Sequence, residues 1–494
     1  MNSTSGARVS IVRASDATKN DGSTVMEEIF ADAIAWDGQY DDATAWEDAV
    51  YTLLRRASND LSQGLGTVRS LCVSGTSASC LMVDANGAVT RTARMYDYNA
   101  LQSSTPEHED IVERVLKALD RYAPKRHTAR AGTGSLAKLL SWMLQEPPKD
   151  GEALCHQADY ISMKLRSEPD QARASIVSDW HNTLKCGYNV RDLEWPAWVL
   201  GCLQQAAGIP MKDAAAILPS PVVAPGGPVG TVSASLAQEF GLSPDTMVVG
   251  GTTDSNAAFF AAVGGTQAAM GTAVTSLGST LAMKQLSSTF VEDATRGVYS
   301  HRFPTTTTTA TTATTTTTTT TDGDDDDGTA AQSANEAWLV GGASNVGCAV
   351  LRSQDFSNQE LQELSTQMDS TKDLPLSYYP LVKKGERFPT ADAEKLPVLE
   401  PKPATRVEYL QAILEGISNV ERDGFSVLGE LGATPSIPST VWTCGGGSRN
   451  DAWTAIRQRK LRECFETDDI VVARAPNTEA SYGAAVLAAS SFLS

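Results

Sequence analysis

The chain has 494 residues, 41% hydrophobic and 20% charged, an ordinary composition for a soluble protein of two or three domains. Its formal net charge of −19 argues against nucleic acid as a partner, because neutralising phosphates requires clustered lysine and arginine. No apolar stretch is long enough to span a bilayer, so no membrane partner is expected. The eight cysteines form no C-x-x-C pair, which favours reduced thiols in a cytoplasmic protein and gives no metal signature.

The first predicted element is a strand in "RVSIVRAS", where Val9, Ile11 and Val12 suit extended backbone. It follows the small, hydroxylated stretch "STSGA", which resembles a hairpin turn, and a hairpin turn joins two strands. The printed sequence holds the second of these strands and not the first. We therefore expect the coding DNA upstream of Met1 to continue in frame with about five to ten apolar-rich residues, the scale of one strand.

Amphipathic helices are predicted in residues 44–57 and 407–417, where apolar side chains recur with helical spacing. Short apolar runs suited to strands, "SLCV", "CLMVD", "MVVGG" and "DDIVVAR", alternate with such helices. This interleaving predicts the α/β class.

Three turns rich in glycine, serine and threonine precede apolar strands, in "STSGARVSIV", "SGTSASCLMVD" and "GTAVTSLGSTLAM". Such turns present backbone N–H groups without bulky side chains, which suits phosphate oxygens. For any one of them, a plain tight turn is the simpler interpretation. The repetition indicates that the same hairpin motif occurs in two related domains. The chain has no G-x-x-x-x-G-K-[ST] loop, no G-x-S-x-G elbow and no H-E-x-x-H motif.

The stretch "TMVVGGTTDSNAAFFAAV" is read as an apolar strand, a double-glycine turn and the start of an apolar helix. Asp254 then lies at the helix N-terminus. Two interpretations stay open here: a carboxylate that only caps the helix, or one held ionised by the helix dipole at the edge of the sheet where α/β proteins bind ligands.

Residues 305–332 hold a threonine tract followed by an acidic run, which has little to bury and is predicted to be a solvated loop within a domain. The acidic run does not fit the EF-hand calcium loop, because its glycine falls one place late and Ser333 stands where the bidentate glutamate belongs.

A fourth stretch, "VWTCGGGSRNDAWTAIRQR", places three glycines after a strand and before a helix. Gly445, Gly446 and Gly447 permit close approach of a flat ligand, and the indole of Trp453 could cover an aromatic base, although a lone tryptophan is more often part of a core.

In this order, "STSGAR", "GGTTDS", "GTAVTSLGST", "CGGGSRNDAW" and "TEASYGAAVLA" resemble the FGGY carbohydrate kinases, which have a two-domain actin-like (ribonuclease H-like) fold with an ATP and sugar cleft. "SGTSAS", "RMYDYN", "ERFP" and "TAIRQR" resemble most the pentulose kinases of plants and cyanobacteria that favour D-ribulose. The resemblance implies a sugar-binding domain in residues 1–263 and an ATP-binding domain in residues 264–494. A plastid location is the alternative if a targeting segment precedes Met1.

The resemblance also implies ATP-dependent phosphorylation of a pentulose at its 5-hydroxyl, with Mg²⁺ bound to ATP and Asp254 as the general base or as the group that orients the attacking hydroxyl. The residues that it implies for the sugar are Ser77, Asp97, Asp254 and Ser255. Those that it implies for ATP are Thr4, Ser5, Gly271, Thr272, Gly445, Gly446, Gly447, Asn450 and Trp453. The oligomeric state is not predicted.

Two departures from the family pattern suggest an alternative to the kinase function. Met1 stands where the family has the aspartate of an Asp-Phe-Gly strand end that helps to hold Mg²⁺, and Asn99 cannot replace the arginine of the family's substrate signature. The alternative is a non-catalytic, actin-like protein that binds ATP or sugar. We expect the upstream strand to end in Asp-Phe-Gly or a close variant, which would favour the enzyme.

Overall fold

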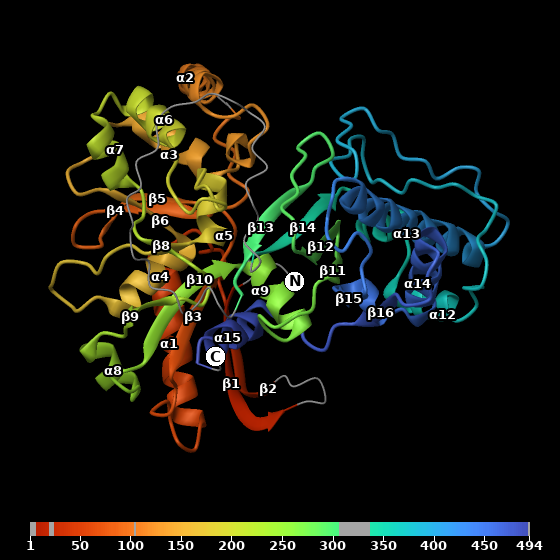
Figure 1. Ribbon diagram of the computed structural model, residues 1–494, viewed down its shortest axis with the longest axis horizontal. Helices are drawn as coiled ribbons and strands as arrows, with labels where there is room; N and C mark the ends of the chain where they lie inside the picture. The colour runs from red at the N-terminus through yellow and green to blue at the C-terminus, as the bar shows by residue number, and fades with distance from the viewer. Residues whose placement is uncertain (1–5, 19–23, 103–104, 306–335, 493–494) are drawn as a thin grey trace.

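The computed structural model describes residues 6–18, 24–102, 105–305 and 336–492, in which strands and helices interleave and form two lobes (Figure 1). This arrangement confirms the predicted α/β class. The elements of the first lobe are β1 (Gly6–Thr18), β2 (Thr24–Ala35), α1 (Ala43–Asp60), β3 (Ser70–Gly75), β4 (Cys80–Val83), β5 (Val89–Arg94), α2 (Pro106–Tyr122), η2 (Thr128–Arg130), α3 (Ser135–Gln145), β6 (Ala153–His156), α4 (Gln157–Arg166), β7 (Ser178–Asp179), α5 (Trp180–Thr183), η3 (Leu184–Cys186), α6 (Ala197–Ala207), α7 (Met211–Ile217), β8 (Val222–Val223), β9 (Pro228–Thr231), α8 (Ala234–Phe240), β10 (Met247–Thr253) and α9 (Asp254–Val263).

The second lobe is built on a six-stranded sheet in the order β13–β14–β12–β11–β15–β16. Its strand β11 is antiparallel to β12 and parallel to β15. The elements that follow α9 are β11 (Thr272–Leu277), β12 (Leu281–Ser287), β13 (Tyr299–Phe303), β14 (Ala337–Ser344), α11 (Ala349–Ser353), α12 (Asn358–Ser365), α13 (Arg406–Glu430), β15 (Thr440–Cys444), η4 (Gly446–Arg449), α14 (Asp451–Phe465), β16 (Val471–Arg474) and α15 (Ala480–Ser490).

The strand predicted in "RVSIVRAS" is confirmed as part of β1. In the described residues β1 pairs only with β2, and this hairpin is a sheet of its own. A separate sheet has the order β3–β10–β9, with β10 parallel to β3 and antiparallel to β9. The first lobe also holds the sheets β5–β4–β6 and β7–β8, so its described residues form four sheets where those of the second lobe form one.

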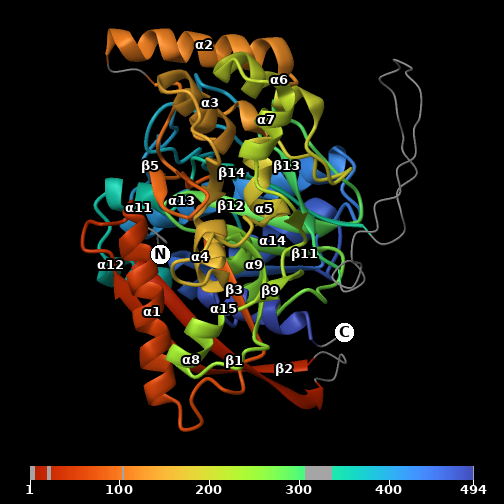
Figure 2. The ribbon, with the colours of Figure 1, turned by 90° about the vertical axis from the view of Figure 1, so that its left-hand side faces the viewer.

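The C-terminal helix α15 packs on the first lobe, between the hairpin and α9 (Figure 2). Ser481 on α15 forms a hydroxyl–hydroxyl hydrogen bond of 2.8 Å with Ser10 on β1, and Ser70 on β3 donates to the carbonyl of Ala488. Gly483 lies so close to α9 that a Cβ there would fall 1.8 Å from the carbonyl oxygen of Ala257. Part of the predicted domain 264–494 therefore packs on the strands of 1–263, and the boundary at residue 263 stays a prediction.

The double-glycine turn predicted before Asp254 is wrong, because Gly250 and Gly251 both lie inside β10. Neighbouring backbone explains these glycines: a Cβ on Gly250 would lie 2.4 Å from the oxygen of Ala224, and one on Gly251 would lie 2.7 Å from the oxygen of Val73. Local sequence cannot distinguish this close approach from a turn, since both require glycine.

The threonine-rich and acidic tract lies outside the described residues, apart from Thr305. Its two ends are adjacent, because Phe303 at the end of β13 pairs with Ala337 at the start of β14. Deleting residues 305–328 should leave thermal stability and turnover nearly unchanged, since residues 329–336 can still join the two strands. Melting temperature and rate, measured on the deleted and full chains, check this, and a large loss of either would mean that the tract packs or binds.

In the described parts of the chain, no helix combines the length and hydropathy needed to cross a membrane. All eight cysteines are free thiols, as the sequence predicts.

Candidate active site

Asp254 is the first residue of α9 and directly follows the last residue of β10. Thr253 occupies the N-cap position, and Asp254 Oδ1 accepts a hydrogen bond of 2.7 Å from the backbone N–H of Ser255. The side chain of Asp254 is half-buried, whereas Ser255 is exposed. The predicted placement of Asp254 at a helix N-terminus is confirmed. Thr253 makes no side-chain capping hydrogen bond, and the Asp254 carboxylate accepts a backbone N–H of the first turn, so both interpretations of Asp254 remain predictions.

A lysine that sequence reasoning missed crosses from the second lobe to this helix start. Lys284 on β12 donates to Ser255 Oγ at 3.1 Å and to Asn256 Oδ1. Removal from solvent lowers the pKa of Lys284 to about 7, while the charge of Asp254 acts in the opposite direction. Nothing local in "LAMKQLS" predicts this contact, because strand and helix meet only in the folded chain.

Other basic side chains lie in the same part of the fold as Asp254 and Lys284. Burial lowers the pKa of Lys185 on η3, Asp254 opposes this shift, and Arg387 reinforces it. Burial also lowers the pKa of His181 to about 3 and that of His301, so both imidazoles are neutral near pH 7. Lys185 and Lys284 both interact with the charge of Asp254 and can carry positive charge near it, a suitable setting for an anionic ligand.

The predicted sugar-side residues lie in two turns of the first lobe. Ser77 is half-buried in the turn after β3, and Asp97 is exposed in the turn after β5. Lys138 is 0% exposed, and its ammonium donates to the carbonyls of Ala78 at 2.8 Å and Met95 at 2.6 Å. This lysine, which the sequence did not identify, therefore joins the two turns.

The carboxyl ends of β11 and β15 carry two glycine-containing turns side by side. Gly445 has φ +83°, and a Cβ there would lie 2.6 Å from the oxygen of Leu277, so this position requires glycine. Gly446 is exposed and has open space where a Cβ would point. The facing turn is Gly278–Thr280, in which Ser279 and Thr280 are exposed. These turns form an open, small-residue surface at the edge of a parallel strand pair, a common place for phosphate ligands.

The structure does not bring Gly271 and Thr272, which were predicted to meet the ATP phosphates, to these two turns. Thr272 pairs with Thr440 at the beginning of β15, whereas Gly445 follows the end of that strand. Thr272 therefore lies a strand length, roughly 16 Å, from the glycine turn. A glycine next to a hydroxyl residue occurs both before β11, at Gly271, and after it, at Gly278. The hairpin turn is the second of these, because it joins β11 to β12.

Trp453 cannot cover an adenine base, because its side chain is 1% exposed and its Nε1 donates to Ser418 Oγ and the carbonyl of Leu414. The indole instead packs against the glycine turn, since a Cβ on Gly447 would lie 2.5 Å from Trp453 Cζ3. Asn450 caps α14 by accepting from the Trp453 N–H, and its amide donates to Ser365. Thr4 and Ser5 lie outside the described residues.

Comparisons with known proteins agree with this architecture. Residues 304–492 match the model of the C-terminal domain of the FGGY family of carbohydrate kinases. The match covers the C-terminal part of the chain and supports a carbohydrate kinase, a phosphotransferase.

Solved structures similar to this protein cover nearly the whole chain. A xylulose kinase from Bifidobacterium adolescentis has 17% identity and a TM-score of 0.66, with 99% of this chain and 93% of that chain covered. A gluconate kinase from Lactobacillus acidophilus has 15% identity and a TM-score of 0.66, covering 99% and 87%. A glycerol kinase from Plasmodium falciparum with ADP has 14% identity and a TM-score of 0.68, covering 99% and 88%. The fold is the two-domain actin-like fold that the sequence predicted.

The described residues of this protein fit a nucleotide bound with Mg²⁺. Gly446 is open, and the neighbouring turn exposes Ser279 and Thr280. Magnesium bound through ATP needs only one or two protein carboxylates, because phosphate oxygens and water fill its other positions. Asp254 is a carboxylate that can take such a position. No group of three or more acidic, histidine or cysteine side chains suited to a metal occurs in the described ranges.

Replacing Lys284 with methionine is expected to lower sugar-dependent turnover roughly tenfold, because hydrogen bonds to a charged group that fix the start of α9 would be lost. Lys284→Arg should restore part of the rate. Lys383→Met, an exposed position, is the matched control. Steady-state kinetics check the prediction, and a Lys284→Met enzyme with the rate of the Lys383→Met enzyme would contradict it.

Proposed function

We propose that this protein transfers the γ-phosphoryl group of ATP to a pentulose, giving the 5-phosphate, with D-ribulose preferred over D-xylulose. The observation that carries this proposal is the position of Asp254, a half-buried carboxylate at the start of α9 that both lobes contact. In this proposal, residues 1–263 bind the sugar and residues 264–494 bind ATP.

Asp254 is the group proposed to accept the proton of the attacking hydroxyl. Lys284 holds the neighbouring Ser255 and Asn256, and with Lys185 supplies positive charge where negative charge gathers. The turns at Gly278–Thr280 and Gly445–Gly447 offer small residues and backbone N–H groups to the phosphates. Bound Mg²⁺ would neutralise phosphate charge.

The pentulose preference rests on the resemblance of "SGTSAS", "RMYDYN", "ERFP" and "TAIRQR" to D-ribulose kinases. Ser77, Asp97, Asp254 and Ser255 are the residues proposed to contact the sugar. Because Lys138 joins the turns that carry Ser77 and Asp97, one buried side chain supports both. The similar structures are named for xylulose, gluconate and glycerol, so this fold accommodates sugars, sugar acids and polyols.

The test is ADP release measured over ketopentoses, aldonates, polyols and hexoses. D-Ribulose should give the highest kcat/KM, with D-xylulose next. A higher kcat/KM for a polyol or an aldonate would overturn the substrate assignment. If the chain binds ATP but no sugar stimulates ADP release, even with an apolar strand ending in Asp-Phe-Gly fused ahead of Met1, the non-catalytic alternative replaces the enzyme.

A further inference from the structure

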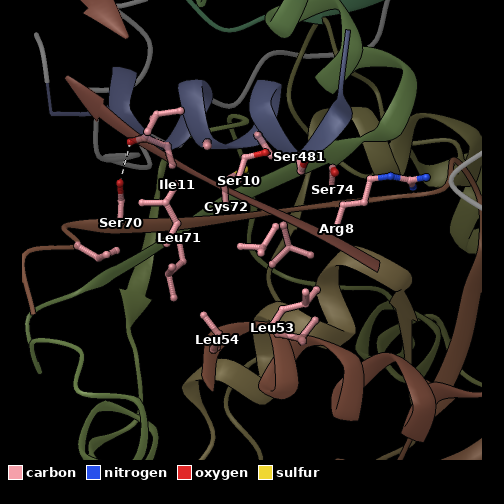
Figure 3. A pocket seen from close by; sticks show the side chains of 18 of the residues that line it. Arg8, Ser10, Ile11, Leu53, Leu54, Ser70, Leu71, Cys72, Ser74 and Ser481 are labelled. Carbon is pink, nitrogen blue, oxygen red and sulfur yellow. Dashed lines mark hydrogen bonds between the residues drawn. The ribbon is translucent and has the colours of Figure 1, made fainter. Parts of the chain in front are cut away.

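The turn after β3 and the start of α9 lie side by side at the carboxyl ends of two parallel strands. Gly75, the last residue of β3, pairs with Thr253, the last residue of β10, so the turn that carries Ser77 begins next to Asp254. Ser74, labelled in Figure 3, and Asp254 both line a cavity of about 620 Å³. This arrangement allows one ligand to contact Ser77 and Asp254 together.

Lys185 reaches the same region from η3. A Cβ on Gly134 would lie 3.0 Å from the carbonyl oxygen of Lys185, so η3 packs against the start of α3, the helix that carries Lys138. The charge of Lys185 interacts with those of Lys138 and Asp254, and the charge of Asp97 interacts with that of Lys138 as well. Lys185 therefore lies in the same site as the turns proposed for the sugar and the start of α9.

The ammonium of Lys185 makes no hydrogen bond and no ion pair within the described residues, although the residue is half-buried. The other two lysines of this region are engaged. Two carbonyls accept from Lys138, and two side chains of α9 accept from Lys284. A donor shielded from water without an acceptor is costly, so the N–H donors of Lys185 are available to a ligand.

The proposed substrate, a 2-ketopentose that is phosphorylated at its 5-hydroxyl, must bind as an open chain. The ring of a 2-ketopentose closes through the 5-oxygen, so only the open-chain form has that hydroxyl free, and this form carries a carbonyl group at C2. A carbonyl oxygen accepts hydrogen bonds and donates none. Ionised Asp97 and Asp254 also only accept, so neither can bind the carbonyl, and the site needs a donor for it.

We propose that the Lys185 ammonium donates a hydrogen bond to the carbonyl oxygen of an open-chain ketopentose whose 5-hydroxyl faces Asp254. This inference rests on the proposed function and makes Lys185 the residue that selects a ketose. In the sugar alcohol of the same chain, a hydroxyl replaces the carbonyl and can donate to Asp97 or Asp254, so its binding depends less on Lys185. Ser77 and Ser255 can donate too, but hydrogen bonds from neutral hydroxyls are weaker than those from an ammonium.

The test compares a ketose with its alcohol, D-ribulose with ribitol, by isothermal titration calorimetry. Lys185→Met keeps an unbranched side chain and removes its donors. We expect the Kd for D-ribulose to rise at least about tenfold, the scale of a lost hydrogen bond from a charged group, and the Kd for ribitol to change much less. Lys185→Arg should recover part of the affinity for D-ribulose. Lys125→Met, at an exposed position of the same lobe, is the matched control and should bind both compounds as the parent does.

The ratio of the two affinities separates a carbonyl contact from a structural role. Equal losses for D-ribulose and ribitol would mean that Lys185 supports the site or acts through Asp254, and an unchanged Kd for D-ribulose would mean that it does not touch the sugar. Either result, or a parent protein that binds neither compound, would overturn the inference. Calorimetry does not depend on turnover, so a parent that binds D-ribulose without phosphorylating it would contradict the proposed function and leave the selective loss in Lys185→Met standing.

Discussion

Replacing Asp254 with asparagine is expected to lower sugar-dependent ATP turnover by about 10²–10⁴-fold while leaving the fold intact. The amide keeps the shape of the carboxylate and removes the acceptor for the hydroxyl proton. Paired measurements of kcat and melting temperature check this. Asp245→Asn, in the loop before β10, is the matched control and should leave both values unchanged.

A merely structural role for Asp254 predicts the opposite pattern. The melting temperature would then shift and the rate would stay within a few-fold of the parent. Asp254→Glu adds a further distinction, because it keeps the carboxylate and moves it by one methylene. A general base should recover part of the rate in this variant relative to Asp254→Asn.

Replacing Arg457 with methionine is expected to destabilise the second lobe by about 3–5 kcal/mol, because it leaves the carboxylate of Glu421 buried without its cation. Arg457 is 1% exposed and makes two hydrogen bonds to Glu421, of 2.6 and 2.7 Å. Arg457 also donates to Thr443 on β15, and Thr275 on β11 donates to Glu421. This network fixes α13 and α14 to the two strands that carry the glycine turns.

Urea unfolding followed by far-ultraviolet circular dichroism measures the effect. Arg422→Met is the control, since its guanidinium pairs with Asp423 at a more exposed position and should cost less than about 1 kcal/mol. Adding Glu421→Gln to Arg457→Met should recover part of the loss, because the unpaired buried charge is removed. If Arg457→Met unfolds at the same urea concentration as Arg422→Met, the network does not support the lobe.

The sequence predicted the features that depend on neighbouring residues. The strand in "RVSIVRAS" and the helix start at Asp254 follow from short-range patterns, and both are confirmed. The actin-like fold could be predicted from the order of the motifs along the chain, because that order was matched against a family of proteins whose fold is known.

Predictions that depended on distant contacts were less successful. Gly250 and Gly251 serve the approach of neighbouring backbone, and Trp453 packs against α13, so local composition suggested a turn and a ligand contact instead. Lys284 and Lys138 had no local signal at all, since their partners are more than 25 residues away along the chain.

The most direct test of the kinase assignment follows the γ-phosphoryl group itself. ATP labelled in that group is incubated with D-ribulose and either the printed chain, the chain with an apolar strand ending in Asp-Phe-Gly fused ahead of Met1, or the Asp254→Asn variant of that fusion. The account predicts label in a pentulose phosphate with the fused chain, and a rate at least about a hundredfold lower after the Asp254 substitution. Binding of ATP by the fused chain without transfer of label to D-ribulose, D-xylulose or any other sugar would contradict it.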